Sequence, residues 1–249
     1  ASSYGAGDSG NITINATESI SLLDYGSVMN KLYADSSGNG GKIFISAPLL
    51  IMDHGQIEGD IVVDSSAKTG SDIIIKAGKV ALNNSAEITA DTLSTGKAGS
   101  ISIDATESVI ISDSRISAET VRSGQGGNIT INTPYLGMEK EGSISTESSI
   151  LATGAGGSIL LNVDNLAVND SRIESGSMGS GKGGDITIKA SDGIDRSNSW
   201  VTSSAGWHGG DGGNITITAG SLSITNNSVI SSEANNVGKG GDLKIEASG

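Results

Sequence analysis

The sequence predicts an all-β protein: a right-handed parallel β-helix, or β-solenoid, of eight to nine coils, with about 28–31 residues and three short strands in each coil. Three observations predict it. One repeat continues from end to end, apolar and polar residues alternate within each copy, and aromatic residues make up only 3% of the chain. With so few aromatic rings, small aliphatic side chains have to fill the core.

The repeat consists of glycine, a small polar residue, isoleucine, a variable residue and a second aliphatic residue. Neighbouring copies are 27 to 31 residues apart, and no segment lies outside the pattern. The first apolar position falls at Ile12, Ile43, Ile73, Ile101, Ile129, Ile159, Ile186, Ile215 and Leu243.

Each copy holds three short apolar segments with the period of a β-strand. In the first segment Ile12 and Ile14 point to one side and Thr13 to the other. A second apolar pair and a third apolar position follow, so that each strand can pair with its equivalent one coil above and below. The core predicted for the first strand consists of Ile12, Ile14, Ile43, Ile101, Ile103, Ile129, Ile131, Ile159, Ile186, Ile188, Ile215 and Ile217.

Right-handed winding follows from the strong preference of parallel crossover connections for that hand. The corner between the second and third strands carries Asp or Asn, which tolerate left-handed backbone. This column is expected to hold Asp24, Asp53, Asn83, Asp113, Asp170 and Asn226. A glycine-rich turn then precedes the next copy, as in residues 124–127.

The chain is predicted to be a single β-helix segment, residues 1–249. Bulges or loops are expected at two irregular coils, residues 133–156 and 191–207, where the apolar pattern is interrupted. Neither end carries a polar cap, which a solenoid needs, so we expect the segment to belong to a longer repeat array.

The net charge of the chain limits the kinds of molecule that it can bind. Only 15 Lys and Arg stand against 28 Asp and Glu, a net charge of −13, so binding to nucleic acid phosphates is not expected. No apolar stretch is long enough to span a membrane as a helix, and membrane insertion is not expected either. Disulfides are excluded by the absence of cysteine.

The phrases Gly-Gly-Asn-Ile-Thr-Ile at residues 126–131 and 212–217 and Gly-Gly-Asp-Ile-Thr-Ile at 183–188 resemble the repeats of filamentous-haemagglutinin-like exoproteins of two-partner secretion systems. The resemblance covers essentially the whole chain. It implies a right-handed β-helical shaft, export through the outer membrane by a secretion partner, and roles in adhesion, aggregation and biofilm. The family's Asn-Pro-Asn secretion motif is missing here, so recognition by the transporter would use a domain outside this segment.

Polysaccharide lyases and glycoside hydrolases share this architecture and are the enzymatic alternative. Catalysis would need carboxylates, or a carboxylate with Arg or Lys, projecting together from neighbouring coils. The outward position after the first strand reads Asn15, Ser46, Lys76, Asp104, Asn132, Asn162, Lys189, Thr218 and Glu246. Because no carboxylate cluster forms there, we expect no enzyme and no catalytic residue.

Two binding sites are considered. Asp24 and Asp53 should lie one coil apart, close enough to share Ca²⁺ with loop carbonyls, although turn chemistry explains both residues and no cofactor is required. Trp200, Trp207, His208 and Asp211 gather near one glycine loop, where an exposed indole could stack on a sugar. The alternative is that the tryptophans only cover the side of the rod.

The leading hypothesis is therefore an extracellular shaft at the bacterial cell surface, structural and adhesive, that carries a binding tip or associates end to end with other copies. A carbohydrate-binding module that recognises glycans is the second hypothesis, and a polysaccharide-degrading enzyme is the third.

Overall fold

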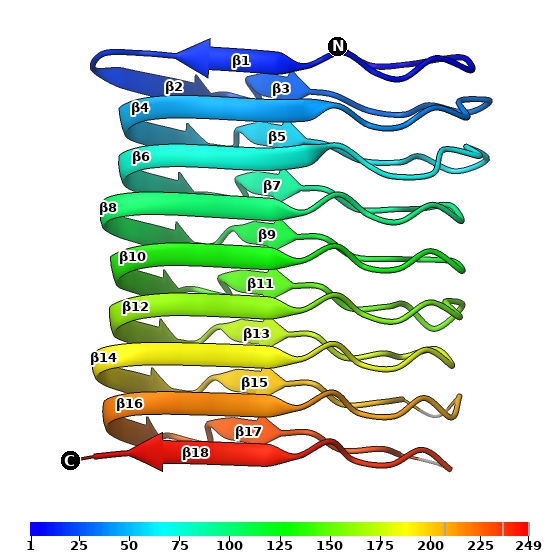
Figure 1. Ribbon diagram of the computed structural model, residues 1–249. Helices are drawn as coiled ribbons and strands as arrows, with labels where there is room; N and C mark the ends of the chain where they lie inside the picture. The colour runs from blue at the N-terminus through cyan, green and yellow to red at the C-terminus, as the bar shows by residue number, and fades with distance from the viewer. Residues whose placement is uncertain (207, 236, 249) are drawn as a thin grey trace.

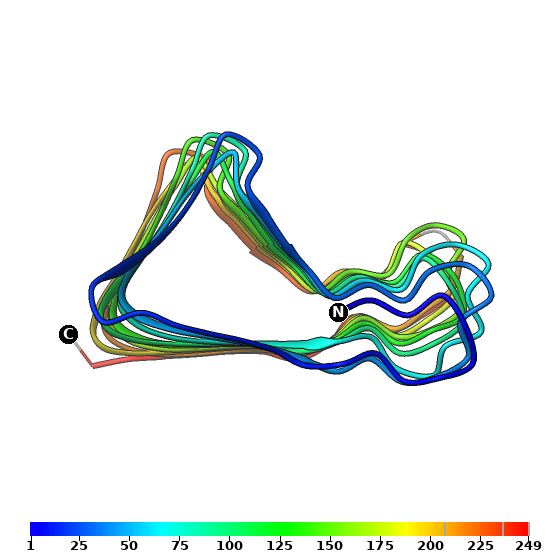
Figure 2. The same ribbon diagram turned by 90° about the horizontal axis from the view of Figure 1, so that it is seen from above.

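The computed structural model describes residues 1–206, 208–235 and 237–248, and every regular element within them is a β-strand. The strands stack into a tall three-sided coil with an arm of loops along one corner (Figures 1 and 2). Seen from the N-terminal end, the chain runs clockwise as it moves away from the viewer (Figure 2), so the winding is right-handed. The all-β parallel solenoid predicted from the sequence is confirmed.

Two parallel sheets build the coil, with ten and eight strands among the described residues. The larger sheet consists of β1 (Ile12–Asn15), β2 (Ser19–Leu23), β4 (Lys42–Asp53), β6 (Asp72–Asn83), β8 (Ile101–Ser112), β10 (Ile129–Glu139), β12 (Ile159–Asn169), β14 (Ile186–Ser197), β16 (Ile215–Thr225) and β18 (Leu243–Ala247). The smaller sheet consists of β3 (Ser27–Met29), β5 (Gln56–Glu58), β7 (Glu87–Thr89), β9 (Arg115–Ser117), β11 (Ser143–Ser145), β13 (Arg172–Glu174), β15 (Trp200–Thr202) and β17 (Val229–Ser231).

Each full coil contains two strands where the sequence predicts three. From β4 to β16, the first and second predicted strands join into one strand of 11 or 12 residues that bends around a corner (Figure 2). Only β1 and β2 in the first coil remain separate. The inward alternation resumes after the bend with a change of phase: in β4 the buried side chains are Ile43, Ile45 and Ala47 before it and Leu50 and Met52 after it. Some strands carry one further residue at the bend as a β-bulge.

The register shifts place such bulges in two strands, β8 and β14, each of which has one residue more at the bend than both of its neighbours. The β14 bulge, between Ala190 and Gly193, lies at the start of the second stretch expected to be irregular, residues 191–207. The β8 bulge, between Ala105 and Ser108, lies outside both stretches, and in the first of them, residues 133–156, β10 pairs with β12 without a shift.

The core is a set of aliphatic ladders in which each residue lies on its equivalent in the next coil. Ile101, Ile129 and Ile159 are direct register partners and are 0–1% exposed. All predicted core isoleucines from Ile43 to Ile217 are buried, whereas Ile12 and Ile14 in the first coil are partly buried. Stacked strands about 4.8 Å apart bury these side chains with few large residues.

The predicted Asp and Asn column needs a correction in its register. Asp24 has a left-handed backbone, with φ of 49°, but Asp53 pairs with Leu23, one position earlier. His54, with φ of 55°, occupies the left-handed corner of the second coil. The same corner is held by Asn84 and, in a later coil, by Asn198. Alignment by residue type shifted two members of the column by one place.

The glycine-rich segments form the arm, and they do not form tight left-handed turns. Gly209 is the one described glycine with a positive φ. A Cβ on Gly127 would lie 1.7 Å from the carbonyl oxygen of Gly99, and one on Gly157 would lie 1.8 Å from that of Gly127. Glycine is therefore required because backbones of successive coils approach closely in the arm.

Candidate functional site

The predicted sugar-binding residues belong to separate parts of the coil. Trp200 lies half-buried on β15, where the guanidinium carbon of Arg172 is 5.6 Å from the centre of its ring. His208 and Asp211 are exposed in the arm that follows, and Asp211 accepts a hydrogen bond of 2.8 Å from the backbone N–H of Lys239. Trp207 lies outside the described residues. Sugar binding by these residues stays a prediction.

The predicted calcium pair does not form a cluster with other ligands. The Asp53 carboxylate is occupied by protein groups: it lies 2.7 Å from Nδ1 of His54 and accepts bonds of 3.1 Å from the amide of Asn84. The Asn84 bond and then the His54 bond hold the pKa of Asp53 below its usual range. In the described ranges no group of three His, Asp or Glu side chains is arranged to hold a metal. Calcium binding by Asp24 and Asp53 stays a prediction.

A column of carboxylates that the sequence analysis missed runs beside the smaller sheet. Asp60, Asp91, Glu119 and Glu147 each precede one residue of the parallel bridge series from Ile61 to Ser148. All four are half-buried. The backbone N–H of Asp91 donates to Asp60 (2.9 Å), and that of Glu119 donates to Asp91 (2.7 Å). Each of these two bonds ties a coil to its neighbour.

The electrostatics of the column reflect its burial. Burial, followed by the charges of Asp60 and Glu119, raises the pKa of Asp91 to about 7. Burial, followed by the charges of Glu174 and Glu119, raises the pKa of Glu147 to about 7. Burial also raises the pKa of Asp60 and Glu174.

Basic side chains offset only part of this negative charge. Lys31 pairs with Glu58 and lies 3.8 Å from Asp60, and Arg115 lies 3.8 Å from Asp91. Perturbed carboxyls of this kind occur both at active sites and in structural networks. Here the bonds of Asp60 and Asp91 to the backbone of the next coil favour the structural role.

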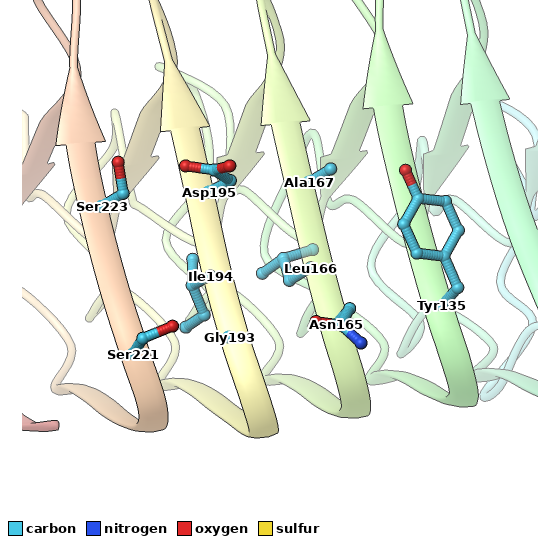
Figure 3. Close-up of a pocket in the computed structure, with 9 residues that line it drawn as sticks. All are labelled: Tyr135, Asn165, Leu166, Ala167, Gly193, Ile194, Asp195, Ser221 and Ser223. Atoms are coloured by element: carbon cyan, nitrogen blue, oxygen red, sulfur yellow. The ribbon is translucent and has the colours of Figure 1, made fainter. Parts of the chain in front are cut away.

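A second surface lies on the part of the larger sheet that follows the bend, around Tyr135 (Figure 3). It is an open depression of about 580 Å³. Its lining comes from β10, β12, β14 and β16 and consists of Tyr135, Asn165, Leu166, Ala167, Gly193, Ile194, Asp195, Ser221 and Ser223.

Register explains the shape of this depression. One outward row runs through Tyr135, Asn165, Gly193 and Ser221, which are partners on neighbouring strands. The next outward row runs through Gly137, Ala167, Asp195 and Ser223. Small residues in the middle of both rows lower the surface between the tyrosine ring and the polar groups.

Sequence reasoning missed both surfaces for the same reason: it followed only the outward positions of the first strand. The spacings between Asp60, Asp91, Glu119 and Glu147 match the coil length and could have revealed the column. Tyr135 and Asp195 lie in the two stretches where the apolar pattern is interrupted, and the bulges in β8 and β14 change the sequence spacing to their partners.

No protein-family model, curated protein or solved structure matches this chain. Its class is therefore defined by its own geometry: a right-handed parallel β-solenoid with a half-buried carboxylate column and an open depression beside an exposed tyrosine. No helix of the described chain is long and apolar enough to cross a bilayer.

Proposed function

We propose that the protein is a structural shaft of an extracellular bacterial surface filament or adhesin, and that it acts in attachment, aggregation and biofilm. The observation that carries the proposal is the stacking of equivalent residues in every coil from Ile12 to Ala247. A parallel solenoid of this kind is stiff along its axis, because each coil is bonded to its neighbours over its whole length. It can hold a binding tip away from a cell or continue into further coils.

The net charge of −13 agrees with this role, since a strongly acidic surface resists nonspecific association with nucleic acids and other polyanions. The resemblance of the Gly-Gly-Asn-Ile-Thr-Ile phrases to exoprotein repeats supports the surface location. Secretion through an outer-membrane partner would then depend on a domain outside this segment.

Surface display tests the proposal. The chain is anchored on a non-adherent Gram-negative host, and settling of the cells and biofilm mass are measured. We expect both to increase relative to cells that display the anchor alone. The Ile131→Asp variant places a charge in the buried ladder and should abolish the increase.

Thr130→Asp is the matched control, because Thr130 lies on the same strand and points outward. This variant should behave like the unchanged chain. Equal attachment by the anchor alone would contradict the shaft proposal. Release of reducing or unsaturated sugars from polysaccharides by the purified chain would favour the enzymatic alternative instead.

Carbohydrate binding is the second candidate function, and one observation favours it: the depression beside Tyr135 joins an exposed aromatic ring to several polar side chains. A role for the cluster predicted around Trp200 is tested separately by substituting Trp200 with alanine and comparing glycan binding.

A further inference from the structure

The depression beside Tyr135 has the chemistry of a sugar-binding surface. Tyr135 is 40% exposed. A Cβ on Gly137 would lie 3.0 Å from Cε1 of the Tyr135 ring, so the ring leans over the bare backbone of Gly137. This contact restricts the ring and leaves it beside the depression as a largely preformed apolar platform.

Polar groups stand opposite the ring on the neighbouring strands (Figure 3). Asp195 is exposed, and its carboxylate makes no hydrogen bond or ion pair with the described part of the chain. Asn165 donates one N–H to Asp192 (3.1 Å), which leaves its carbonyl oxygen as an acceptor. Ser221 donates to the carbonyl oxygen of Asp192 (3.4 Å) and offers its oxygen as an acceptor, and Ser223 adds a hydroxyl group that can donate or accept. Carboxylate, amide and hydroxyl groups together match the many hydroxyls of a sugar.

The charge of the depression selects among sugars. Asp195 is its charged lining residue, and no Lys or Arg lines it. A uronate or sulfated chain would meet repulsion from Asp195 with no basic partner in compensation. Neutral hydroxyls, in contrast, donate charge-assisted hydrogen bonds to the carboxylate.

The size of the depression fits more than one sugar ring. Four neighbouring strands contribute to it, and strands lie about 4.8 Å apart, so the distance from Tyr135 to Ser221 is roughly 14 Å. We propose that this surface binds a short neutral oligosaccharide, with the Tyr135 ring stacked on one sugar and Asn165 and Asp195 bonded to hydroxyls of the chain. The shaft role does not depend on this binding, so either can fail without the other.

Binding of defined tetrasaccharides to the purified chain tests the proposal. The probes are neutral tetrasaccharides of β-linked glucose, mannose and galactose, with tetragalacturonate as the anionic comparison, measured by saturation-transfer NMR and calorimetry. We expect at least one neutral probe to bind. Tyr135→Ala and Asp195→Asn should each weaken that binding by tenfold or more.

A third variant fills the depression and leaves the ring in place. The Cβ of Gly193→Leu would first meet the Ser221 hydroxyl, at 2.7 Å, and that hydroxyl can rotate away. This variant should also weaken binding by tenfold or more. Tyr25→Ala is the control, because Tyr25 is 74% exposed in the first coil, away from the depression, and its loss should leave affinity unchanged.

Unchanged circular dichroism and melting temperature establish that each variant is folded. The proposal is overturned if no neutral probe binds at millimolar concentration, or if binding persists in Tyr135→Ala and Gly193→Leu. It is also overturned if tetragalacturonate binds more tightly than the neutral probes, or if Tyr25→Ala weakens binding as much as Tyr135→Ala does.

Discussion

Arg196 is a charged residue inside the aliphatic core. It is 1% exposed and lies in register between Val168 and Ile224, at an inward position that other coils fill with residues such as Leu82. One guanidinium nitrogen, Nη2, donates to the carbonyl oxygens of Ser199 (2.9 Å) and Val229 (2.8 Å). Nε and Nη1 make no hydrogen bond within the described chain. Burial lowers the pKa of Arg196 to about 10.

Replacing this guanidinium should stabilise the protein. Because burying a charge without an ionic partner is unfavourable, we expect Arg196→Met to raise the free energy of unfolding by about 1–4 kcal/mol. Urea unfolding followed by circular dichroism measures the change. Arg122→Met is the control, since Arg122 is exposed, and its effect should stay within about 0.5 kcal/mol. Destabilisation by Arg196→Met would show that the two bonds to carbonyl oxygens outweigh the cost of desolvation.

The carboxylate column makes stability depend on pH. Asp91 and Glu147 have pKa values of about 7 in the folded chain and near 4 when unfolded, so between these values the folded state binds more protons. The free energy of unfolding should therefore decrease as pH rises from 5 to 8, by on the order of 2–3 kcal/mol for each of the two groups, and change little above that range.

Urea titrations at pH 5, 6, 7 and 8 measure this slope. The double variant Asp91→Asn and Glu147→Gln keeps an acceptor oxygen at each position but removes the charge, so it should flatten the slope. Asp211→Asn changes an exposed carboxylate in the arm and should leave the slope as it is. An increase of stability with pH in the unchanged chain would contradict the raised pKa values of Asp91 and Glu147.

The arm is the element in which glycine matters most. Backbones of successive coils approach closely at its glycines, and a Cβ at Gly127 would lie 1.7 Å from the Gly99 carbonyl oxygen, which cannot rotate away. Gly127→Ala should therefore lower the free energy of unfolding by at least about 1–3 kcal/mol. Gly7→Ala is the matched control because a Cβ there meets nothing within 4 Å. Equal melting temperatures for the two variants would contradict close packing in the arm.

At the level of elements, the strands could be predicted from the sequence because alternation and repeat length both constrain them. Ile129, Ile131 and their equivalents lie where the alternation places them. The continuous strand around the bend could not be predicted, since local residue types do not reveal whether Ala105 to Ser108 breaks the ladder or bends it. The Tyr135 depression could not be predicted either, because it depends on the cross-strand register of four coils.

The whole molecule is a one-dimensional stack. Equivalent strands pair only with those of the coils above and below, and most of the described tertiary structure repeats this arrangement (Figure 1). In such a stack, stability is approximately a sum over coils and over the interfaces between them. The molecule should then tolerate the loss or gain of a whole coil, but not the deletion of part of a coil.

Removal of one full coil tests this property. Deleting residues 101–128 joins Ser100 to Ile129, and it brings Ile129 opposite Ile73, the position that Ile101 leaves. We expect this variant to fold, with the same circular dichroism per residue and a rod about 4.8 Å shorter by small-angle scattering.

Deleting residues 101–114 removes half a coil, so β9 would follow the arm directly and its side chains would lose their partners. That variant should unfold or aggregate. If both deletions unfold alike, cooperativity extends beyond neighbouring coils, and the shaft could not be lengthened by adding repeats of the same kind.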